Sequence, residues 1–563
     1  MRLDNSLDVI KYLIASILVG VILGIGGAFA AQGFRLGIVL VSDYSERLFA
    51  RDPNIFFYLI TLSLALVLVH YSRILINGKP FQSVSDSIYL AHKANNETDL
   101  KVGFISTFAA FFSASGGASI GQYGPLVHFG TTLGAWLKKT VPFNFTPDLY
   151  IGAGVAASIS SGFGAPLAGL IFAHEAILRH YSHKSILAIA TASGISYAVS
   201  TGIWGDTNII NVSSENFNLL LILVISFLAG PIFGLIAILY MKSLLFFAKL
   251  ASSDKLSVFF KYLIGVLSLS IIGHFMPEVM GLGAETVSGV LNSSYTLIFL
   301  VIILIGKILA TSISLNFGFF GGVFSPAILV GAAAGAVVST FLVTVGIFED
   351  FQQAFVISGI AAVAGAVIGA PICMVIIVLE LTNSYAYALA SLVGLAISVG
   401  YVQVRFGSSY FDVQLLNRGI DISDGRTGLF MTETDILRFA ETNFHTIKES
   451  ETVESAVSLM SKIDQSELIV VNQSGEFIGK TNSLSLFNKE GSLSSAEVID
   501  KDCVFIEHDA SLQSAMEIAS NFVGEVIPIV HSDQNKAVAI ITEGAIFQAY
   551  LSKQNQTVEM EKR

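Results

Sequence analysis

The chain has 563 residues, of which 53% are hydrophobic and 13% are charged, and its mean hydropathy is +0.71. This composition is too apolar for an ordinary soluble protein. Residues 428–563 contain 21 acidic and 10 basic residues and therefore carry the whole formal charge of −11, which argues against binding to nucleic acid or to anionic lipid.

Long runs without Asp, Glu, Lys or Arg follow one another up to about residue 404. They lie at 12–34, 53–72, 102–137, 149–174, 216–241, 308–348, 351–379 and 381–404. Because a helix needs about 20 apolar residues to cross a bilayer, the runs predict an all-α polytopic membrane protein. The first run is too long for the apolar core of a signal peptide, so we expect no cleavage there.

Lysine and arginine in the loops indicate the orientation of the chain. Arg179–Lys184 and Lys242–Lys261 carry Lys and Arg, whereas Gly205–Asn216 carries neither. By the positive-inside rule, the loops at Arg179–Lys184 and Lys242–Lys261 face the cytoplasm. We expect both termini on the same side.

Two pairs of segments inside these runs resemble each other. Gly164–Glu175 (GAPLAGLIFAHE) matches Gly369–Glu380 (GAPICMVIIVLE), and Gly124–Ala135 (GPLVHFGTTLGA) matches Ser325–Ala336 (SPAILVGAAAGA). The matching prolines are 205 and 201 residues apart, which is too similar for coincidence. We therefore expect two related halves, at about 10–202 and 216–421. Repeats of this kind build transporters whose substrate site lies between broken helices at mid-membrane.

Both halves contain a glycine- and proline-bearing turn just before a long apolar run. Gly121–Pro125 (GQYGP) and Gly321–Pro326 (GGVFSP) therefore predict helix starts. A helix N-terminus offers free N–H groups and a partial positive charge, so two converging starts would form an anion site. Alternatively, these glycines only allow close helix packing. The repetition of the turn favours the anion site.

These turns resemble motifs of the CLC family of chloride channels and chloride/proton exchangers. GQYGP is similar to its G(K/R)EGP motif, GVFSP (Gly322–Pro326) to GxFxP, and Ser408–Gly419 (SSYFDVQLLNRG) to the segment with its anion-coordinating tyrosine. Asn77–Ile88 (NGKPFQSVSDSI) lies where GSGxP is expected. The anion-binding residues that the resemblance implies are Lys79, Gly121, Gln122, Tyr123, Gly124, Gly322, Val323, Phe324 and Tyr410.

The resemblance also implies the architecture and the partners. It implies the CLC fold with an inverted internal repeat, and a homodimer with an independent pore in each subunit. The transported ligand would be chloride or a similar anion, with no cofactor and no metal. We expect the protein to be integral to a lipid bilayer, namely a bacterial inner membrane.

Three residues depart from the family pattern. The gating glutamate falls on Tyr123, the inner proton-transfer glutamate of exchangers falls on Ala176, and the coordinating serine of GSGxP falls on Lys79 when no gap is introduced. A phenol with a reference pKa of about 10 neither competes with anions nor carries protons at neutral pH. We therefore expect passive anion conduction that is uncoupled from protons.

Alternatives remain open at several of these positions. Tyr123 could be a core aromatic at a helix start, and Lys79 could equally be a solvent-facing loop lysine. His128, His174 and Glu175 could form a different proton path and make the protein an exchanger, although such groups more often have structural roles. A third possibility is a membrane sensor that binds anions without transporting them.

The C-terminal segment has a repeat of its own. Glu451–Phe487 parallels Ala510–Phe547, and each segment predicts helix, strand, turn, strand and helix. This pattern resembles a tandem CBS pair, at about 436–488 and 496–553. We therefore expect a transmembrane domain at 1–424 and a cytoplasmic α/β domain at 425–563.

Nucleotide binding by the CBS pair is doubtful. In CBS pairs that bind adenine nucleotides, a Thr or Ser is followed three residues later by an Asp that contacts the ribose. Here Thr481 is followed at that spacing by Leu484, and Thr542 by Ala545. A dimerising and stabilising module is therefore the favoured interpretation.

The sequence indicates no disulfide framework, metal site or enzyme active site. The two cysteines, Cys373 and Cys503, define no disulfide framework and no metal site. The sequence also contains no recognisable nucleophile–base set or phosphate-binding loop, so we do not expect an enzyme.

Overall fold

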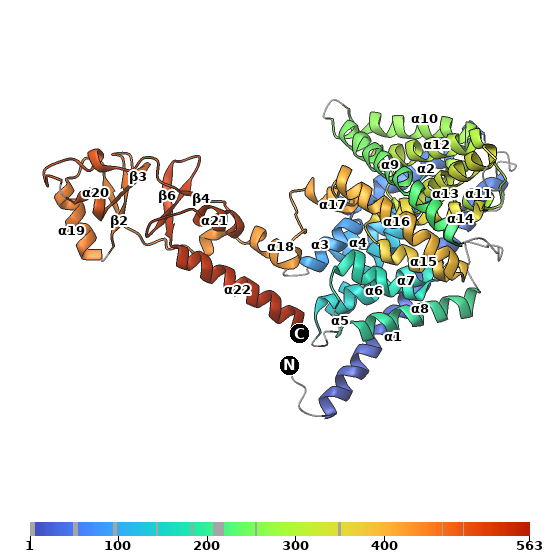
Figure 1. Cartoon of the computed structure of the whole chain (residues 1–563), viewed down its shortest axis with the longest axis horizontal. Helices are drawn as coiled ribbons and strands as arrows, with labels where there is room; N and C mark the ends of the chain where they lie inside the picture. Colours follow the sequence, from blue (N-terminus) through green and yellow to red (C-terminus); the bar gives the residue numbers. More distant parts are fainter. Residues whose placement is uncertain are drawn as a thin grey trace. The chain divides into compact units, whose positions relative to one another are not determined.

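The computed structural model describes residues 6–48, 54–93, 98–141, 143, 145–181, 184–205, 219–253, 256–346, 351–463, 465–487 and 489–562. The chain forms two compact units, Met1–Ile420 and Asp421–Arg563 (Figure 1). The first unit is helical, and the second contains two small β-sheets with flanking helices.

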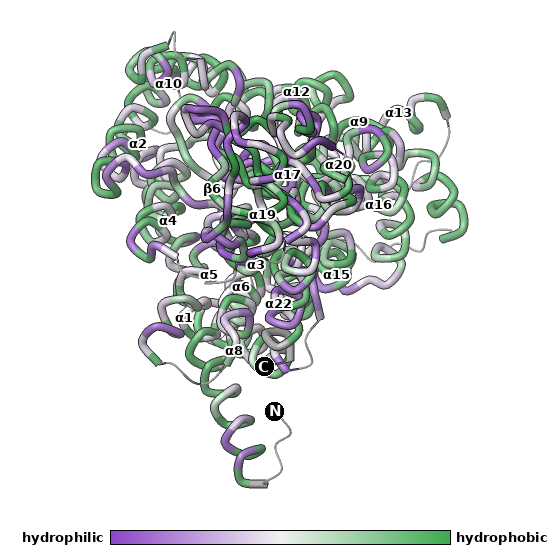
Figure 2. The backbone as a smooth tube through the Cα atoms, turned by 90° about the vertical axis from the view of Figure 1, so that its left-hand side faces the viewer, coloured by the Kyte–Doolittle hydropathy of each residue, from purple (hydrophilic) through white to green (hydrophobic). Residues whose placement is uncertain are grey.

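The first unit is an integral membrane domain. Eight of its described helical stretches are long and apolar enough to span a bilayer, and Figure 2 shows the hydrophobic colouring along α2, α10 and α12. The elements are α1 (Ser6–Leu48), α2 (Ile55–Leu75), α3 (Val84–His92), α4 (Leu100–Ser115), α5 (Tyr123–Thr140), α6 (Pro147–Phe163), α7 (Pro166–Phe172), the π-helix η1 (Ala173–Leu178), α8 (Ile186–Trp204), α9 (Leu219–Ala251), α10 (Val258–Phe275), the 3₁₀ turn η2 (Pro277–Val279), α11 (Ala284–Leu291), α12 (Leu297–Asn316), α13 (Phe324–Thr344), α14 (Gln352–Ile368), α15 (Pro371–Thr382), α16 (Tyr385–Arg405) and α17 (Tyr410–Leu416).

The two halves of this unit pack in the same way. Helix α1 contacts α6 and α8, as α9 contacts α14 and α16. The crossing of α5 on α6 brings Gly130 and Gly154 so close that a Cβ on either would overlap the carbonyl of the other, and Gly331 and Gly359 repeat this contact between α13 and α14. Glycine is therefore required at both crossings, and the inverted internal repeat is confirmed as the organising principle of the fold.

Two glutamates link the halves reciprocally. The carboxylate of Glu380, at the end of α15, accepts hydrogen bonds from the N–H groups of Leu167 and Ala168 at the start of α7, both at 2.8 Å. The carboxylate of Glu175, in η1, accepts from the N–H groups of Ile372 and Cys373 at the start of α15, at 2.9 and 2.7 Å. Each half therefore supplies the acceptor for the free N–H groups of a helix in the other half.

The second unit repeats one βαββα arrangement. Its elements are α18 (Gly425–Glu433), η3 (Ile436–Phe439), β1 (Thr446–Lys448), α19 (Val453–Ile463), β2 (Glu467–Val471), β3 (Phe477–Asn482), α20 (Ser483–Leu486), η4 (Ser495–Val498), β4 (Ile506–Glu507), α21 (Leu512–Ala519), β5 (Ile527–His531), β6 (Lys536–Ile541) and α22 (Glu543–Lys562). The sheet orders are β1-β2-β3 and β4-β5-β6.

Matching registers and cores show the equivalence of the two repeats. The first pair of strands in each sheet is parallel, with Ile447 opposite Val470 and Ile506 opposite Ile529, and the second pair is antiparallel. These four side chains lie in the cores on which α19 and α21 pack. The α/β class expected for this segment is thus confirmed.

Candidate anion site

The two glycine-bearing turns meet. The N–H of Gly121 donates to the carbonyl of Gly322 at 2.7 Å, and the N–H of Gly322 donates to the carbonyl of Gly121 at 2.9 Å, which forms a short antiparallel bridge. The bridge joins the loops directly before α5 and α13, which begin at Tyr123 and Phe324. Two helix N-termini from opposite halves are therefore neighbours, as an anion site built from N–H groups requires.

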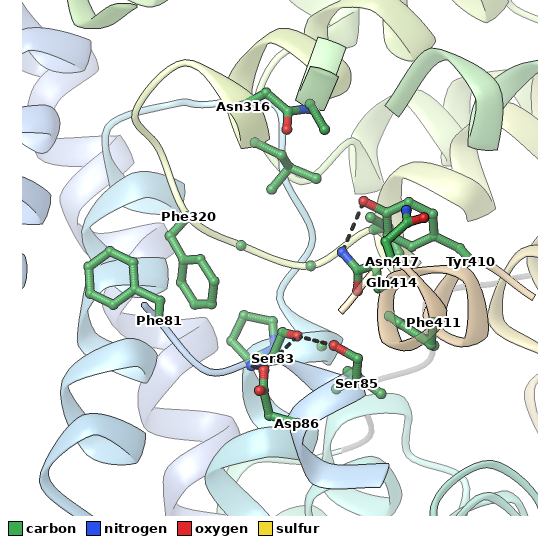
Figure 3. Close-up of a pocket in the computed structure, with 18 of the residues that line it drawn as sticks. Phe81, Ser83, Ser85, Asp86, Asn316, Phe320, Tyr410, Phe411, Gln414 and Asn417 are labelled. Atoms are coloured by element: carbon green, nitrogen blue, oxygen red, sulfur yellow. Dashed lines mark hydrogen bonds between the residues drawn. The ribbon is translucent and has the colours of Figure 1, made fainter. Parts of the chain in front are cut away.

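A cavity of about 340 Å³ lies against these turns (Figure 3). It is bounded by the N-terminal ends of α3 and α17, by the turn before α13, and by side chains of α9 and α12. Its described lining residues are Phe81, Ser83, Val84, Ser85, Asp86, Gly124, Pro125, Leu245, Ala248, Leu315, Asn316, Phe320, Gly321, Gly322, Val323, Tyr410, Phe411, Gln414, Asn417 and Arg418.

Hydroxyl and amide groups converge on this cavity. The Tyr410 hydroxyl accepts a hydrogen bond from Nε2 of Gln414 at 3.1 Å, so its own O–H remains a donor for an anion. The hydroxyls of Ser83 and Ser85 lie 2.8 Å apart at the start of α3 (Figure 3). The cavity therefore offers neutral donors beside the N-termini of two helices, α3 and α17.

Four of the expected anion-binding residues line this cavity, namely Gly124, Gly322, Val323 and Tyr410. Gly121 lies at the bridge, and the buried Gln122 follows it with its N–H 3.3 Å from Oγ of Ser325. Phe324 and Tyr123 lie in an aromatic cluster next to the turns.

The Tyr123 side chain is buried in this cluster and is 3% exposed. Its ring lies parallel to that of Phe163, with centroids 3.7 Å apart, and 5.5 Å from the ring of Phe324. Phe172 extends the cluster beyond Phe324. Tyr123 is not among the described residues that line the 340 Å³ cavity, and the position predicted for the gate therefore holds a packed ring.

The structure places Lys79 away from the 340 Å³ cavity. Its ammonium group lies 2.7 Å from Oδ2 of Asp99, and its side chain is 59% exposed. Asp99 also caps α4 through the N–H of Val102, and these contacts hold the pKa of Asp99 below its usual value, chiefly through the hydrogen bond from Lys79. Lys79 is thus a solvent-facing loop lysine, and a serine four residues later, Ser83, lines the cavity instead.

A capping signal in the sequence could have identified Ser83. The pattern Ser83-Val84-Ser85-Asp86 is a Ser-x-x-Asp capping box, which predicts a helix start there. This helix start lies inside Asn77–Ile88, the segment where the family motif is expected, and four residues after Lys79.

The three candidate proton carriers have structural partners. The ring nitrogens of His128 lie 2.9 Å from Oγ of Ser87 and 3.2 Å from Oε1 of Gln82. Nδ1 of His174 donates to the carbonyl of His180 at 3.0 Å. Glu175 caps α15, as described above. None of the three lines the 340 Å³ cavity in the described part of the chain.

The two threonines of the CBS-like unit are engaged locally. The Thr481 hydroxyl donates to the carbonyl of Val498 at 3.2 Å, and the Thr542 hydroxyl accepts from the N–H of Ala545 at 3.1 Å. Within the first repeat, Lys480 and Glu467 form a buried ion pair at 2.9 Å, and Oε2 of Glu467 also accepts from the N–H groups of Glu525 and Val526 in the second repeat, both at 3.0 Å.

Comparisons with known proteins agree with this geometry. The profile of the family described as "Voltage gated chloride channel" matches residues 82–403, and that of the CBS domain matches residues 496–552. An uncharacterised protein of Methanocaldococcus jannaschii is 27% identical over 324 residues, which cover 57% of this chain and 79% of that protein. The H(+)/Cl(−) exchange transporter ClcA of Vibrio vulnificus is 28% identical over 334 residues, 56% of this chain and 69% of that protein.

Solved structures share the fold. A slow cyanobacterial Cl−/H+ antiporter superposes with a TM-score of 0.61 at 21% identity, covering 72% of this chain and 98% of that one. A eukaryotic CLC transporter superposes with a TM-score of 0.62 at 16% identity, covering 95% and 98%. Since the profile match alone spans more than half of the chain, this protein belongs to the voltage-gated chloride channel family, the CLC family of anion transport proteins.

Proposed function

We propose that this protein conducts anions passively across the membrane, without coupling to protons. Membership of the CLC family supports anion transport itself, and the uncoupled mechanism is what we propose. The observation that carries it is the packed ring of Tyr123 at the position of the gating glutamate. A neutral phenol at this position provides no negative group to compete with the anion and no proton to exchange at neutral pH.

The anion would be held in the cavity by neutral donors. The Tyr410 hydroxyl lies at the start of α17 with its O–H available, and the helix N-termini add partial positive charges. Neutral donors bind an anion without the cost in release that a full positive charge would bring. This arrangement favours conduction over tight retention.

The inner end of a proton path is also missing from the pattern. Ala176 replaces the inner glutamate, and the neighbouring Glu175 accepts two backbone hydrogen bonds from α15. A carboxylate engaged in this way would have to release a helix N-terminus in order to carry a proton. These contacts support the uncoupled mechanism.

The names of the relatives favour a second candidate, proton-coupled exchange. The Vibrio protein is named an H(+)/Cl(−) exchange transporter, and two of the similar structures are described as antiporters, one of them for fluoride. Exchange in this chain would need a proton path through His128 or His174 instead of the usual glutamates.

A single experiment separates these mechanisms. The purified protein is reconstituted into vesicles with a chloride gradient, and anion efflux and proton movement are recorded together. Uncoupled conduction predicts anion efflux with no uphill proton movement. Stoichiometric uphill proton pumping would overturn the proposal in favour of exchange, and anion binding without flux would favour the sensor.

We also propose a homodimer with one pore in each subunit, located in a bacterial inner membrane with both termini in the cytoplasm. The loop charges and the family resemblance support this arrangement. Mass measurement of the protein in detergent and protease access to the tail in oriented vesicles would test it.

A further inference from the structure

Two helices whose N-terminal ends line the cavity begin with the same carboxylate cap. At α3, Oδ2 of Asp86 accepts from the N–H and the hydroxyl of Ser83, at 2.7 and 3.1 Å. At α17, Oδ2 of Asp412 accepts from the N–H and the hydroxyl of Ser409, at 3.3 and 2.7 Å. These are the two helices that present Ser83 and Tyr410 to the cavity.

Such caps conflict with anion binding. A carboxylate in the first turn satisfies free N–H groups and stabilises the helix. The same negative charge opposes the positive end of the helix and repels an anion that approaches it. A helix that is capped by aspartate therefore needs a compensating cation if its N-terminus is to face an anion pathway.

Each cap has that cation, bound to its second oxygen. Oδ1 of Asp86 accepts from the Arg418 guanidinium at 2.8 Å, and Oδ1 of Asp412 accepts from the Arg179 guanidinium. The arginines come from remote parts of the chain, 332 and 233 residues away. In both caps one carboxylate oxygen accepts hydrogen bonds from the helix start, and the other accepts a hydrogen bond from the arginine.

Of these two pairs, the Asp86–Arg418 pair lines the cavity. Asp86 and Arg418 are both among the residues that line the cavity, whereas Asp412 and Arg179 are not. The Asp86 side chain is 18% exposed and that of Arg418 is 44% exposed, so both are accessible to water and ions. The pair of α17 is therefore an internal comparator for the pair of α3.

We propose that Arg418 is a charge-masking and positioning residue, which neutralises the carboxylate cap of α3 so that this helix can point its N-terminus at a passing anion. The inference rests on the proposed function only in that anions occupy the cavity, and it holds for conduction and for exchange alike. Asp86 fixes the helix start that carries Ser83, and Arg418 removes the electrostatic penalty.

The proposal predicts changes of opposite sign for the two partners. Arg418→Gln leaves a net negative charge in the cavity and should weaken anion binding. Asp86→Asn keeps an acceptor for the Ser83 N–H, leaves a net positive charge, and should strengthen binding. The double variant restores neutrality and should bind as the unmodified protein does. A unit charge about 10 Å from the anion changes affinity roughly two- to twentyfold for effective dielectric constants of about 80 to 20.

The test is bromide binding by isothermal titration calorimetry on the full-length protein in detergent, at low ionic strength and again with added gluconate salt. Opposite shifts in Kd for the single variants, recovery in the double variant and attenuation by salt would support the proposal. Equal-signed losses in both single variants would assign the pair a structural role only and overturn it, as would unchanged Kd values.

Two further measurements keep the outcome decisive. Arg179→Gln and Asp412→Asn should lower thermal stability and shift Kd by less than the α3 variants do, because their side chains do not line the cavity. If Arg418→Gln does not fold, the comparison of Asp86→Asn with the unmodified protein decides, since only the charge-masking role predicts tighter binding. Anion flux from vesicles is recorded separately, so that failure of transport, which concerns the proposed function, is distinguished from failure of the binding pattern.

Discussion

Replacing Tyr123 by glutamate is expected to make anion flux depend on pH. Tyr123 is the first residue of α5, directly after the bridge between Gly121 and Gly322. A carboxylate at this helix start would compete with anions for the same N–H groups when ionised, and would release them when protonated. Flux should therefore be low at neutral pH and recover on acidification.

The structure sets the size of the competing effects. The substitution removes a stacked contact with Phe163, whose ring centroid is 3.7 Å away, and this costs about 0.5–1.5 kcal/mol. A negative side chain at a helix N-terminus contributes about 0.3–1 kcal/mol. Burial of a charged carboxylate at a position that is only 3% exposed costs more than this, so folding of the variant is checked in detergent before flux is measured. The protonated fraction of one carboxylate falls up to tenfold per pH unit above its pKa, which predicts a loss of flux of about ten- to a hundredfold between about pH 5.5 and 7.5.

The assay is anion efflux from vesicles at a series of pH values, with Tyr123→Gln as the matched control. Glutamine has nearly the same shape as glutamate but does not titrate, so its flux should not vary with pH. Identical pH profiles for the two variants would refute the reasoning, because they would show that position 123 does not act on the anion pathway.

Three further predictions follow from contacts in the structure. Glu175→Gln should lower the free energy of unfolding by about 1–3 kcal/mol without creating or removing proton coupling, and Glu380→Gln should have a similar effect. Unfolding in detergent measures this change. Unchanged stability in either variant would contradict the capping role. Lys79→Ala should leave anion flux within about twofold of the unmodified protein, because Lys79 pairs with Asp99 in solvent; a large loss would return Lys79 to the pathway. Burial raises the pKa of the Cys503 thiol, so maleimide labelling at neutral pH should be slow in the folded protein and fast after denaturation, and equal rates would contradict the burial.

Local signals predicted the helix starts well. Gly and Pro before an apolar run located the beginnings of α5 and α13, because these residues act on the backbone within one turn. The internal match between the halves then indicated that the two starts are related. The hydrogen bonds between Gly121 and Gly322 join the two helix starts directly. Because these residues belong to different halves, only the structure shows that they are in contact.

At the start of α3 two signals in the sequence disagree. An ungapped match to a family motif placed Lys79 at the anion, although the Ser-x-x-Asp cap that starts the helix begins at Ser83. Motif position and capping chemistry are independent signals, and here the second marks the residue that lines the 340 Å³ cavity. The arginine partners of Asp86 and Asp412 lie hundreds of residues away, and no local pattern predicts such pairs.

The reciprocal glutamates have a consequence for the origin of the chain. A separate polypeptide made of one half would carry an exposed carboxylate at the end of one helix and an uncapped start at another. Two copies of that polypeptide, inserted in opposite orientations, would satisfy each other's requirements. The contacts of Glu175 and Glu380 therefore have the form expected of a duplicated gene whose ancestor assembled as an antiparallel pair. Co-expression of the two halves as separate chains should consequently yield a complex, while either half alone should not accumulate.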